Sequence, residues 1–596
     1  LTLNRSGGAI NSTGLLGARI NLTGSGTQLT VTLADTIGSL SGSGAVVLTQ
    51  GLTLREAGSG AFASSPFSGA TSGVGSLTLS GYGGLTMSGA MSHTGGTTLS
   101  SGSRLILDYG SSGTDLLPTG TLTLNGANVT VISGAGTPTI LDATGVATAL
   151  NAGSSSISSF SVFPAIDPVE HAVGQAGINL GTITRAVGGG LSISQNAAAT
   201  SNTNTNGILG GWATFDGNTW AVSNGASTAI TGLATFSADT FGAGLHVDIT
   251  AAGTNAGGSA DTLRFSGANA SDITGATTLA TGGILVSPTV GANLTTISGA
   301  LNSTLANEEL IIHQFNPLGD LLLSNVGGTN TTLTTTGGGK TILTSTVAGT
   351  GATYNGYGYL QLGSGGTTGM VGSGTILNNG TLGLNRSNAQ SFAAVISGTG
   401  NFEQMGSGTT TLSAANTFAG RVTVGSGTLE VTNNTGLGLG FTSPTNRWGN
   451  LTVVNSTGTL SFTGGVTAVS ELINLNGGAM NIATTAASTY SAPLILTADS
   501  TISLGAGAVT HVLSGQILSG QGVNLTINGT AGGSTLAFTN PNNRINGDLT
   551  IGGDAIVKVG NNSTGTLGVT GSISNSGLLV FDTTDTQFIS NLLSGP

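Results

Sequence analysis

The sequence lacks cysteine and contains few charged residues. A secreted protein without thiols escapes oxidation and mispairing, although the absence of cysteine does not by itself identify a compartment. Charged residues make up 6% of the chain, whereas about 25% is usual for a soluble domain. Thr, Ser and Asn must therefore solvate the surface.

Basic stripes and long apolar runs are also missing. The 12 basic and 23 acidic residues are spread singly and leave a net charge of −11. Without a basic stripe to neutralise phosphates, a nucleic-acid partner is excluded. No run of about 18 apolar residues occurs, so we expect no membrane span in this segment. No signal peptide opens the chain and Leu1 is not an initiator, so we expect a processed product or a segment of a longer protein.

Glycine and internal repetition are what the chain has in abundance. At 596 residues, with 104 Gly, it is too long for one ordinary core and must be several domains or a repeat array. The stretch Val395–Val431 alternates apolar residues with Thr and Ser in short runs that Gly or Asn interrupts. Leu77–Leu107 is a second copy. Strands of about five residues joined by tight turns are indicated, and repetition favours an array.

These copies resemble the autotransporter-associated β-strand repeat. The residues of the first copy that fall on the positions of that motif are Gly406, Gly408, Leu412, Asn416, Phe418, Gly420, Thr423, Val424, Gly427, Thr428 and Leu429. Gln404, Met405 and Arg421 depart from it, at positions where the family carries no chemistry. In the second copy His93 replaces Phe418, and we expect it to be a turn residue and not a ligand.

The repeats predict an all-β fold, and the resemblance implies an elongated, right-handed parallel β-helix, or β-solenoid. Short strands with one apolar face bury it by stacking coil upon coil, at about 20 to 25 residues per coil. Repeated Asn and Thr could form hydrogen-bonded ladders between coils. Hairpins are the rival architecture, since Asn-Gly pairs such as Asn379-Gly380 suit them. Hairpin sandwiches, however, seldom repeat one unit over hundreds of residues.

Three segments are expected along the chain. Residues 1–150 and 331–596 carry solenoid repeats, and the latter segment ends within a repeat. Residues 151–330 form an irregular, variable β segment that continues the solenoid. This middle segment holds the candidate adhesive aromatics Trp212, Phe215 and Trp220. Exposed tryptophans would favour adhesion, and buried ones would favour a purely structural role.

Four places carry residue types that could do chemistry. The GGGKT sequence at 337–341 ends like a phosphate-binding loop but lacks its first glycine. The DPVEH sequence at 167–171, and Glu308-Glu309 near His313, lack the spacing of a zinc site and are assigned to solvated loop charges. Asp261 with Arg264 is the nearest approach to a polysaccharide-degrading site. No Gly-Gly-x-Gly-x-Asp calcium repeat occurs. We therefore predict no catalytic residue, no metal ligand and no cofactor.

The leading hypothesis is a non-enzymatic structural protein, secreted to a bacterial surface as a β-helical stalk or filament segment. The partner expected first is another copy, docked end to end or laterally, because neither end of the chain shows a polar cap. The alternative is an adhesin that binds a surface glycan or protein through the aromatic middle segment. A polysaccharide-degrading β-helix, which would need an acidic cleft, is the third candidate.

Overall fold

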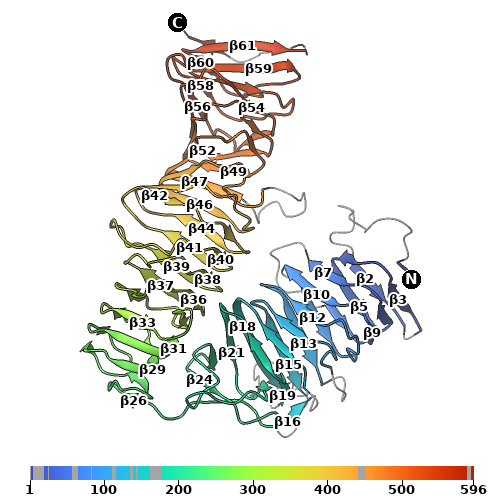
Figure 1. Cartoon of the computed structure of the whole chain (residues 1–596). Helices are drawn as coiled ribbons and strands as arrows, with labels where there is room; N and C mark the ends of the chain where they lie inside the picture. The colour runs from blue at the N-terminus through green and yellow to red at the C-terminus, as the bar shows by residue number, and fades with distance from the viewer. Residues whose placement is uncertain are drawn as a thin grey trace. The chain divides into compact units, whose positions relative to one another are not determined.

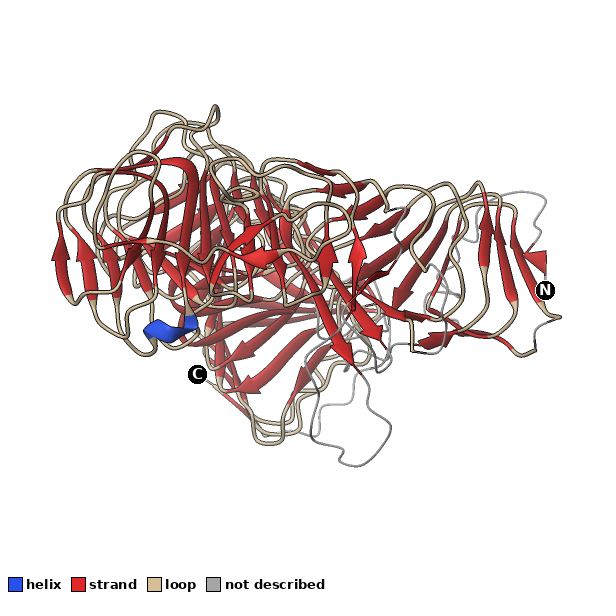
Figure 2. Cartoon of the chain, turned by 90° about the horizontal axis from the view of Figure 1, so that it is seen from below, coloured by secondary structure: helices blue, strands red, loops and turns tan. Residues whose placement is uncertain are grey.

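The structure is a computed structural model that describes residues 2–3, 19–24, 26–56, 65–81, 83–110, 116–133, 139–141, 145–161, 176–440, 451–584, 586 and 592–595. Strands make up nearly all of its regular structure (Figure 2), and the one helix in these ranges is the 3-10 turn Pro288–Val290. The all-β prediction is confirmed. Gly, Thr, Ser and Asn disfavour helix, and no apolar stripe of helical period offsets them.

The chain divides into two compact units. The first comprises Leu1–Ile342 and Val347–Tyr359, and the second comprises Leu343–Thr346 and Leu360–Pro596. The first unit itself contains two stacks of coils, which we call the first stack (residues 19–193) and the second stack (residues 237–355), labelled by their strands in Figure 1.

Two parallel sheets form most of the first stack. One has the order β20 (Ile183–Arg185), β17 (Thr148–Leu150), β14 (Leu122–Leu124), β12 (Thr97–Leu99), β10 (Leu77–Gly81), β7 (Leu52–Glu56) and β4 (Asp35–Ile37). The other has the order β2 (Arg19–Leu22), β5 (Ser39–Gly42), β8 (Ser65–Phe67), β11 (Gly84–Met87), β13 (Arg104–Asp108), β15 (Asn128–Ser133), β18 (Gly153–Ser161), β21 (Gly189–Ile193), β23 (Ala213–Phe215), β24 (Thr219–Val222) and β25 (Thr231–Gly232). Apart from the antiparallel pairs β23–β24 and β24–β25 at the end of the second sheet, each strand pairs with the strand one coil away, which is the topology of a solenoid.

The register explains the core. Leu77 lies opposite Leu52, and Leu79 lies opposite Leu54, while the threonines between them face outward. All four leucines are buried. Each side chain buried in this way contributes about 1.5 to 3 kcal/mol relative to an exposed one. Apolar residues alternate along each strand and occupy matching positions in successive coils, so together they form one continuous apolar interior.

The second stack repeats this arrangement. Its strands are β26 (Ser237–Ala238), β27 (His246–Ile249), β29 (Ser259–Phe265), β31 (Thr277–Val286), β34 (Leu310–Gln314), β36 (Leu333–Thr336) and β38 (Thr353–Asn355) in one sheet, and β28 (Gly253–Asn255), β30 (Ser271–Ile273), β32 (Thr295–Ile297) and β35 (Leu321–Leu323) in the other. Its pairings are parallel. The coil pattern therefore extends into the segment expected to be irregular.

The second unit is also a parallel solenoid. One of its sheets includes β41 (Thr381–Leu384), β42 (Gln390–Phe392), β44 (Asn401–Gln404), β45 (Thr409–Leu412), β46 (Val422–Val431), β47 (Leu451–Phe462), β49 (Leu472–Asn476), β50 (Ala479–Ile482) and β52 (Leu494–Ala498), followed by further strands up to β62 (Leu593–Ser594). Another has the order β48 (Ala468–Val469), β51 (Thr489–Tyr490), β54 (Thr510–Leu513), β57 (Thr535–Phe538), β59 (Ile556–Ser563) and β61 (Leu578–Thr583). The predicted β-solenoid is thus confirmed, and the hairpin alternative is wrong.

Asparagine side chains link successive coils, as the sequence predicts. Asn416 Oδ1 accepts the Ile396 N–H at 2.9 Å, and Asn416 Nδ2 donates to the Gly436 carbonyl at 2.7 Å, with both partners 20 residues away. At the surface, Asn379 Oδ1 accepts the Thr399 N–H at 3.1 Å in the same manner. A buried asparagine in this position satisfies backbone groups that a turn would otherwise leave unpaired.

Replacing Asn416 by alanine is expected to lower the free energy of unfolding of the second unit by about 1 to 3 kcal/mol, because a buried N–H and a buried carbonyl lose their partner. Asn379→Ala is the matched control, and its loss should stay below about 1 kcal/mol since water can replace the amide. Urea denaturation followed by circular dichroism measures both. Equal losses for the two variants would contradict the role of burial.

His93 lies in the connection between β11 and β12, outside any strand. Its side chain is fully buried, as Phe418 is in the other copy. Its Nδ1 lies 2.9 Å from Thr71 Oγ1 and its Nε2 lies 2.9 Å from Thr97 Oγ1. Burial lowers the pKa of His93, so the neutral ring fills the core with both nitrogens satisfied.

Candidate functional site

The aromatic segment forms a joint between the two stacks of the first unit. Its centre is the antiparallel hairpin β23–β24, which interrupts the parallel coils. Asp216 and Gly217 make the hairpin turn with positive φ angles of 52° and 64°, a conformation that Asp tolerates and Gly adopts freely. Trp212 precedes this turn and Trp220 follows it, so both tryptophans belong to the joint.

Trp220 belongs to the interior of the joint. It is fully buried and packs with Ile208 and Leu285. Its ring centroid lies 5.7 Å from that of His313 in an edge-to-face arrangement, and His313 stacks on Phe315 at 6.2 Å. A ligand at the surface cannot reach the Trp220 ring, which indicates a structural role for this residue.

Trp212 and Phe215, the other two candidate adhesive aromatics, are only partly buried and pack against the core of the first stack. Each therefore keeps part of its side chain exposed to solvent. The adhesive role predicted for them stays a prediction.

A buried ion pair lies across the joint. Arg185 Nη2 contacts Glu309 Oε1 at 2.6 Å and Arg185 Nη1 contacts Glu309 Oε2 at 3.0 Å. The Gly188 N–H and the Thr334 hydroxyl also donate to Glu309 Oε1, at 3.1 and 2.7 Å. Glu309 is 3% exposed, so four donors replace the water that its carboxylate loses.

The assignment of Glu308 and Glu309 to solvated loop charges is wrong for Glu309. Its partner Arg185 lies 124 residues earlier in the chain, so no local spacing could indicate the pair. Glu308 does lie near the surface, where its carboxylate accepts the N–H groups of Thr329 and Asn330 at 2.8 Å each. These hydrogen bonds, led by that from Asn330, lower the pKa of Glu308.

His313, in β34, completes the joint. Nε2 lies 2.9 Å from the Gly211 carbonyl oxygen, which can only accept, so Nε2 carries the proton. Nδ1 then accepts from the Thr336 hydroxyl at 2.6 Å. Burial lowers the pKa of His313 to about 4. A neutral histidine with both nitrogens satisfied is a packing residue.

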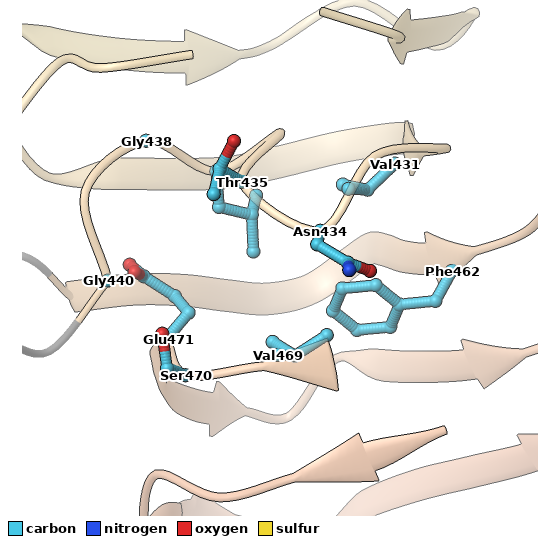
Figure 3. Close-up of a pocket in the computed structure, with 10 residues that line it drawn as sticks. Val431, Asn434, Thr435, Gly438, Gly440, Phe462, Val469, Ser470 and Glu471 are labelled. Carbon is cyan, nitrogen blue, oxygen red and sulfur yellow. The ribbon is translucent and has the colours of Figure 1, made fainter. Parts of the chain in front are cut away.

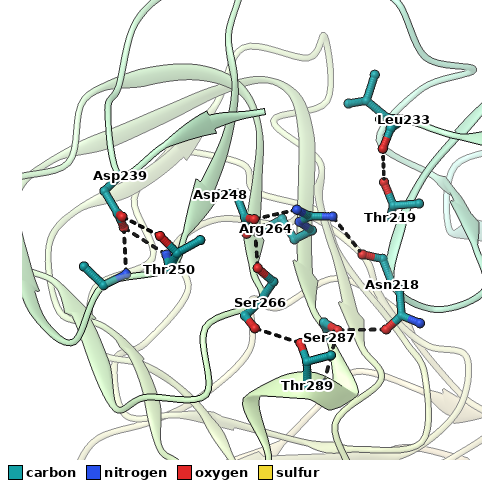
Figure 4. A network of polar contacts seen from close by, with 11 residues as sticks. Asn218, Thr219, Leu233, Asp239, Asp248, Thr250, Arg264, Ser266, Ser287 and Thr289 are labelled. Carbon is teal, nitrogen blue, oxygen red and sulfur yellow. Dashed lines mark hydrogen bonds and ion pairs between the residues drawn. The ribbon is translucent and has the colours of Figure 1, made fainter. Parts of the chain in front are cut away.

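Arg264 has a different partner from the one the sequence indicated. It faces Asp248 on the neighbouring strand, and its Nη2 contacts Asp248 Oδ2 at 2.5 Å. Ser266 Oγ donates to the same oxygen at 2.8 Å (Figure 4). The guanidinium carbon lies 3.5 Å from the ring centroid of Phe236. Asp261, which the sequence singled out as the nearest acid to Arg264, is itself buried, and the ion pair of Arg264 is made with Asp248 instead.

The Arg264 network ties the hairpin to the second stack. Arg264 Nη1 donates to the Asn218 carbonyl at 3.2 Å, and Asn218 Oδ1 accepts from Ser287 Oγ at 2.8 Å (Figure 4). The Arg264–Asp248 ion pair lies against the Phe236 ring, and Arg264 is hydrogen-bonded to the hairpin turn at Asn218. The pair therefore does not offer an acidic cleft to a saccharide. In the described part of the chain, no three His, Asp or Glu side chains gather as metal ligands would.

The remaining motifs have simple positions. The GGGKT sequence forms the turn between β36 and β37 (Lys340–Leu343), with φ of 84° at Gly337. A strand follows the lysine where a phosphate-binding loop requires a helix. The DPVEH sequence at 167–171 lies outside the described residues.

Over the ranges that the structure describes, no helix is long and apolar enough to cross a bilayer.

One small cavity in the second unit contains an ionisable group. Its volume is about 20 Å³, and its lining includes Asn434, Phe462, Ser470 and Glu471 (Figure 3). Glu471 is 5% exposed, accepts from Thr452 Oγ1 at 3.1 Å and leaves Oε2 without a partner. Burial raises the pKa of Glu471 to about 8, so the carboxyl is neutral at pH 7. A cavity of this size holds one water and no substrate.

The comparisons with known proteins agree with the resemblance seen in the sequence. The family model of the passenger-associated-transport-repeat matches residues 77–103 and 402–431. No curated protein matches the chain, and no solved structure does. The matched ranges begin at Leu77 in β10 and at Phe402 in β44, so each match starts within a strand of a regular coil. No catalytic family was matched. The repeat and the solenoid together fit the passenger domain of an autotransporter, a class of secreted or surface protein.

Proposed function

We propose that this chain, a β-solenoid with two passenger-associated-transport-repeats, is a non-enzymatic structural segment that bacteria display at their surface and that associates with other copies of itself. The parallel register of the coils carries the proposal. Each coil that is added to a solenoid buries more apolar surface, and its backbone forms hydrogen bonds with the next coil. Such a fold supplies length and stiffness without a catalytic centre.

Self-association is supported by the surface of β61. This strand is the last of its sheet in the described ranges, and its side chains Leu578 and Phe581 are 53% and 44% exposed. An apolar strand edge is a template for pairing with another strand. A further coil would cover it, supplied either by a continuation of the chain or by a second copy.

Sedimentation velocity and negative-stain imaging of the purified 596-residue chain test this proposal. We expect the sedimentation coefficient to rise with concentration and the images to show assemblies. Leu578→Lys/Phe581→Lys should remain monomeric, because edge lysines oppose strand pairing. Leu294→Lys is the control, since Leu294 is exposed at another place, in the first unit, and it should assemble as the wild type does. A wild-type chain that stays monomeric at every concentration overturns the proposal.

Adhesion is the second candidate function. One observation favours it, namely the aromatic ring of Tyr357, which is 61% exposed and lies outside the segment to which the sequence assigned adhesion.

A further inference from the structure

One corner of the second stack presents an aromatic ring to solvent. The turn 356–358 joins β38 to β39 (Tyr359–Leu362), and the same corner of the preceding coil is the turn 337–339. The Tyr359 N–H donates to the Gly339 carbonyl at 3.1 Å, and the Gly339 N–H donates to the Gln314 carbonyl at 2.8 Å. The backbone of this corner is therefore repeated from coil to coil at about 4.8 Å, and the preceding turn consists of three glycines.

Tyr357 is unusual among the aromatic residues. Tyr357 and Phe581 are the two exposed aromatic side chains among the residues that the structure describes. The Tyr357 ring leans over Gly338, where an added methyl group would lie 3.6 Å from Cε1. Tyr357 is 61% exposed, so most of its side chain faces solvent. A ring held over bare backbone is a platform for stacking.

Two charged groups and a second tyrosine belong to the same coils, since Lys340 and Tyr359 follow Gly338 and Tyr357 by two residues each. Lys340 Nζ is 3.9 Å from Asp320 Oδ2, which is longer than a hydrogen bond, and the two side chains are 36% and 41% exposed. Lys340 Nζ also lies 5.5 Å from the ring centroid of Tyr359. Lys340 and Asp320 thus supply this corner with a donor and an acceptor that have capacity for further hydrogen bonds.

We propose that the corner formed by Tyr357, Asp320, Lys340 and Tyr359 binds an uncharged oligosaccharide. The C–H face of a sugar ring stacks on Tyr357, while sugar hydroxyls accept from Lys340 Nζ and donate to the Asp320 carboxylate. The neighbouring charges of Lys340 and Asp320 cancel, which favours a neutral ligand over an anionic one. Asp320, Lys340 and Tyr357 come from three successive coils, next to β35, β37 and β39, so the corner fits an extended chain better than a single sugar. This inference rests on the second candidate function, adhesion, and names the class of ligand.

Isothermal titration of the full chain with cellohexaose and chitohexaose tests the inference, with a heparin hexasaccharide as the anionic arm. We expect a Kd near 1 mM for at least one neutral probe. Tyr357→Ala should weaken binding about tenfold or more, whereas Tyr357→Phe, which keeps the ring, should bind nearly as the wild type does. Lys340→Gln should weaken binding severalfold. The melting temperatures of the variants verify that the fold is intact.

Leu294→Ala, which shortens another exposed side chain of the first unit, is the matched control and should leave the titration unchanged. Three results would each overturn the inference: neither neutral hexasaccharide binds, Tyr357→Ala binds as tightly as the wild type, or only heparin binds and does so independently of Tyr357. None of them bears on self-association, which is measured separately.

Discussion

Replacing Arg185 by methionine is expected to destabilise the joint of the first unit by about 3 to 5 kcal/mol. The substitution leaves the Glu309 carboxylate, 3% exposed, without the two Arg185 contacts at 2.6 and 3.0 Å. The Gly188 N–H and the Thr334 hydroxyl remain, but they cannot neutralise a buried charge. Native-state hydrogen exchange at the amides of residues 185–190 and 309–336 measures the opening of the joint directly, because a solenoid need not unfold in one step.

Two comparison variants separate the buried charge from the general loss of a cation. Lys558→Met removes the partner of Asp582 from a more exposed pair at 3.2 Å and should change stability by less than about 1 kcal/mol. Arg185→Met/Glu309→Gln removes both charges and should recover much of the loss, since the amide oxygen can still accept from Gly188 and Thr334. If the double variant is as unstable as Arg185→Met, an unpaired buried charge is not the cause.

Replacing Glu471 by glutamine is expected to stabilise the second unit by on the order of 3 kcal/mol at pH 7. Burial raises the pKa of Glu471 from 4.5 to about 8, so folding requires this carboxyl to hold a proton that the unfolded chain releases. Glutamine has the same shape, still accepts from Thr452 Oγ1 and has no proton to hold. Denaturation with urea at several pH values measures the difference.

The pH dependence gives the sharper test of Glu471. Because the folded pKa of Glu471 is raised, the free energy of unfolding of the wild type suffers no loss from this carboxyl below pH 4.5. The free energy of unfolding then falls as the pH rises, and the loss is complete above about pH 8. Wild type and Glu471→Gln should therefore be equally stable near pH 4 and should diverge up to pH 8. Asp554→Asn, at an exposed carboxylate of the same unit, should run parallel to the wild type. A gap between Glu471→Gln and wild type that does not change with pH would show that the carboxyl is not buried.

Local patterns were enough for the strands and turns, and the resemblance of the repeats implied the solenoid. In β10 the sequence Leu77-Thr78-Leu79 places two apolar side chains on one face, and the glycines and asparagines between strands end each run. The repeat at 402–431 carries Asn416 at the position from which it links three coils. These features depend on residues near one another in the chain, so periodicity and turn chemistry can be read without knowing the fold.

The contacts between distant residues were decided by the tertiary structure alone. Whether Arg185 meets Glu309, and whether Arg264 meets Asp248 or Asp261, depends on how many residues each coil contains and how the hairpin β23–β24 turns the chain. Alternation along a strand specifies which face is apolar but not what lies beyond that face. Trp220 is therefore buried and Tyr357 exposed, although both aromatics stand among similar Gly, Thr and Asn residues. Register and coil length, which a single sequence does not reveal, determine which side chains reach solvent.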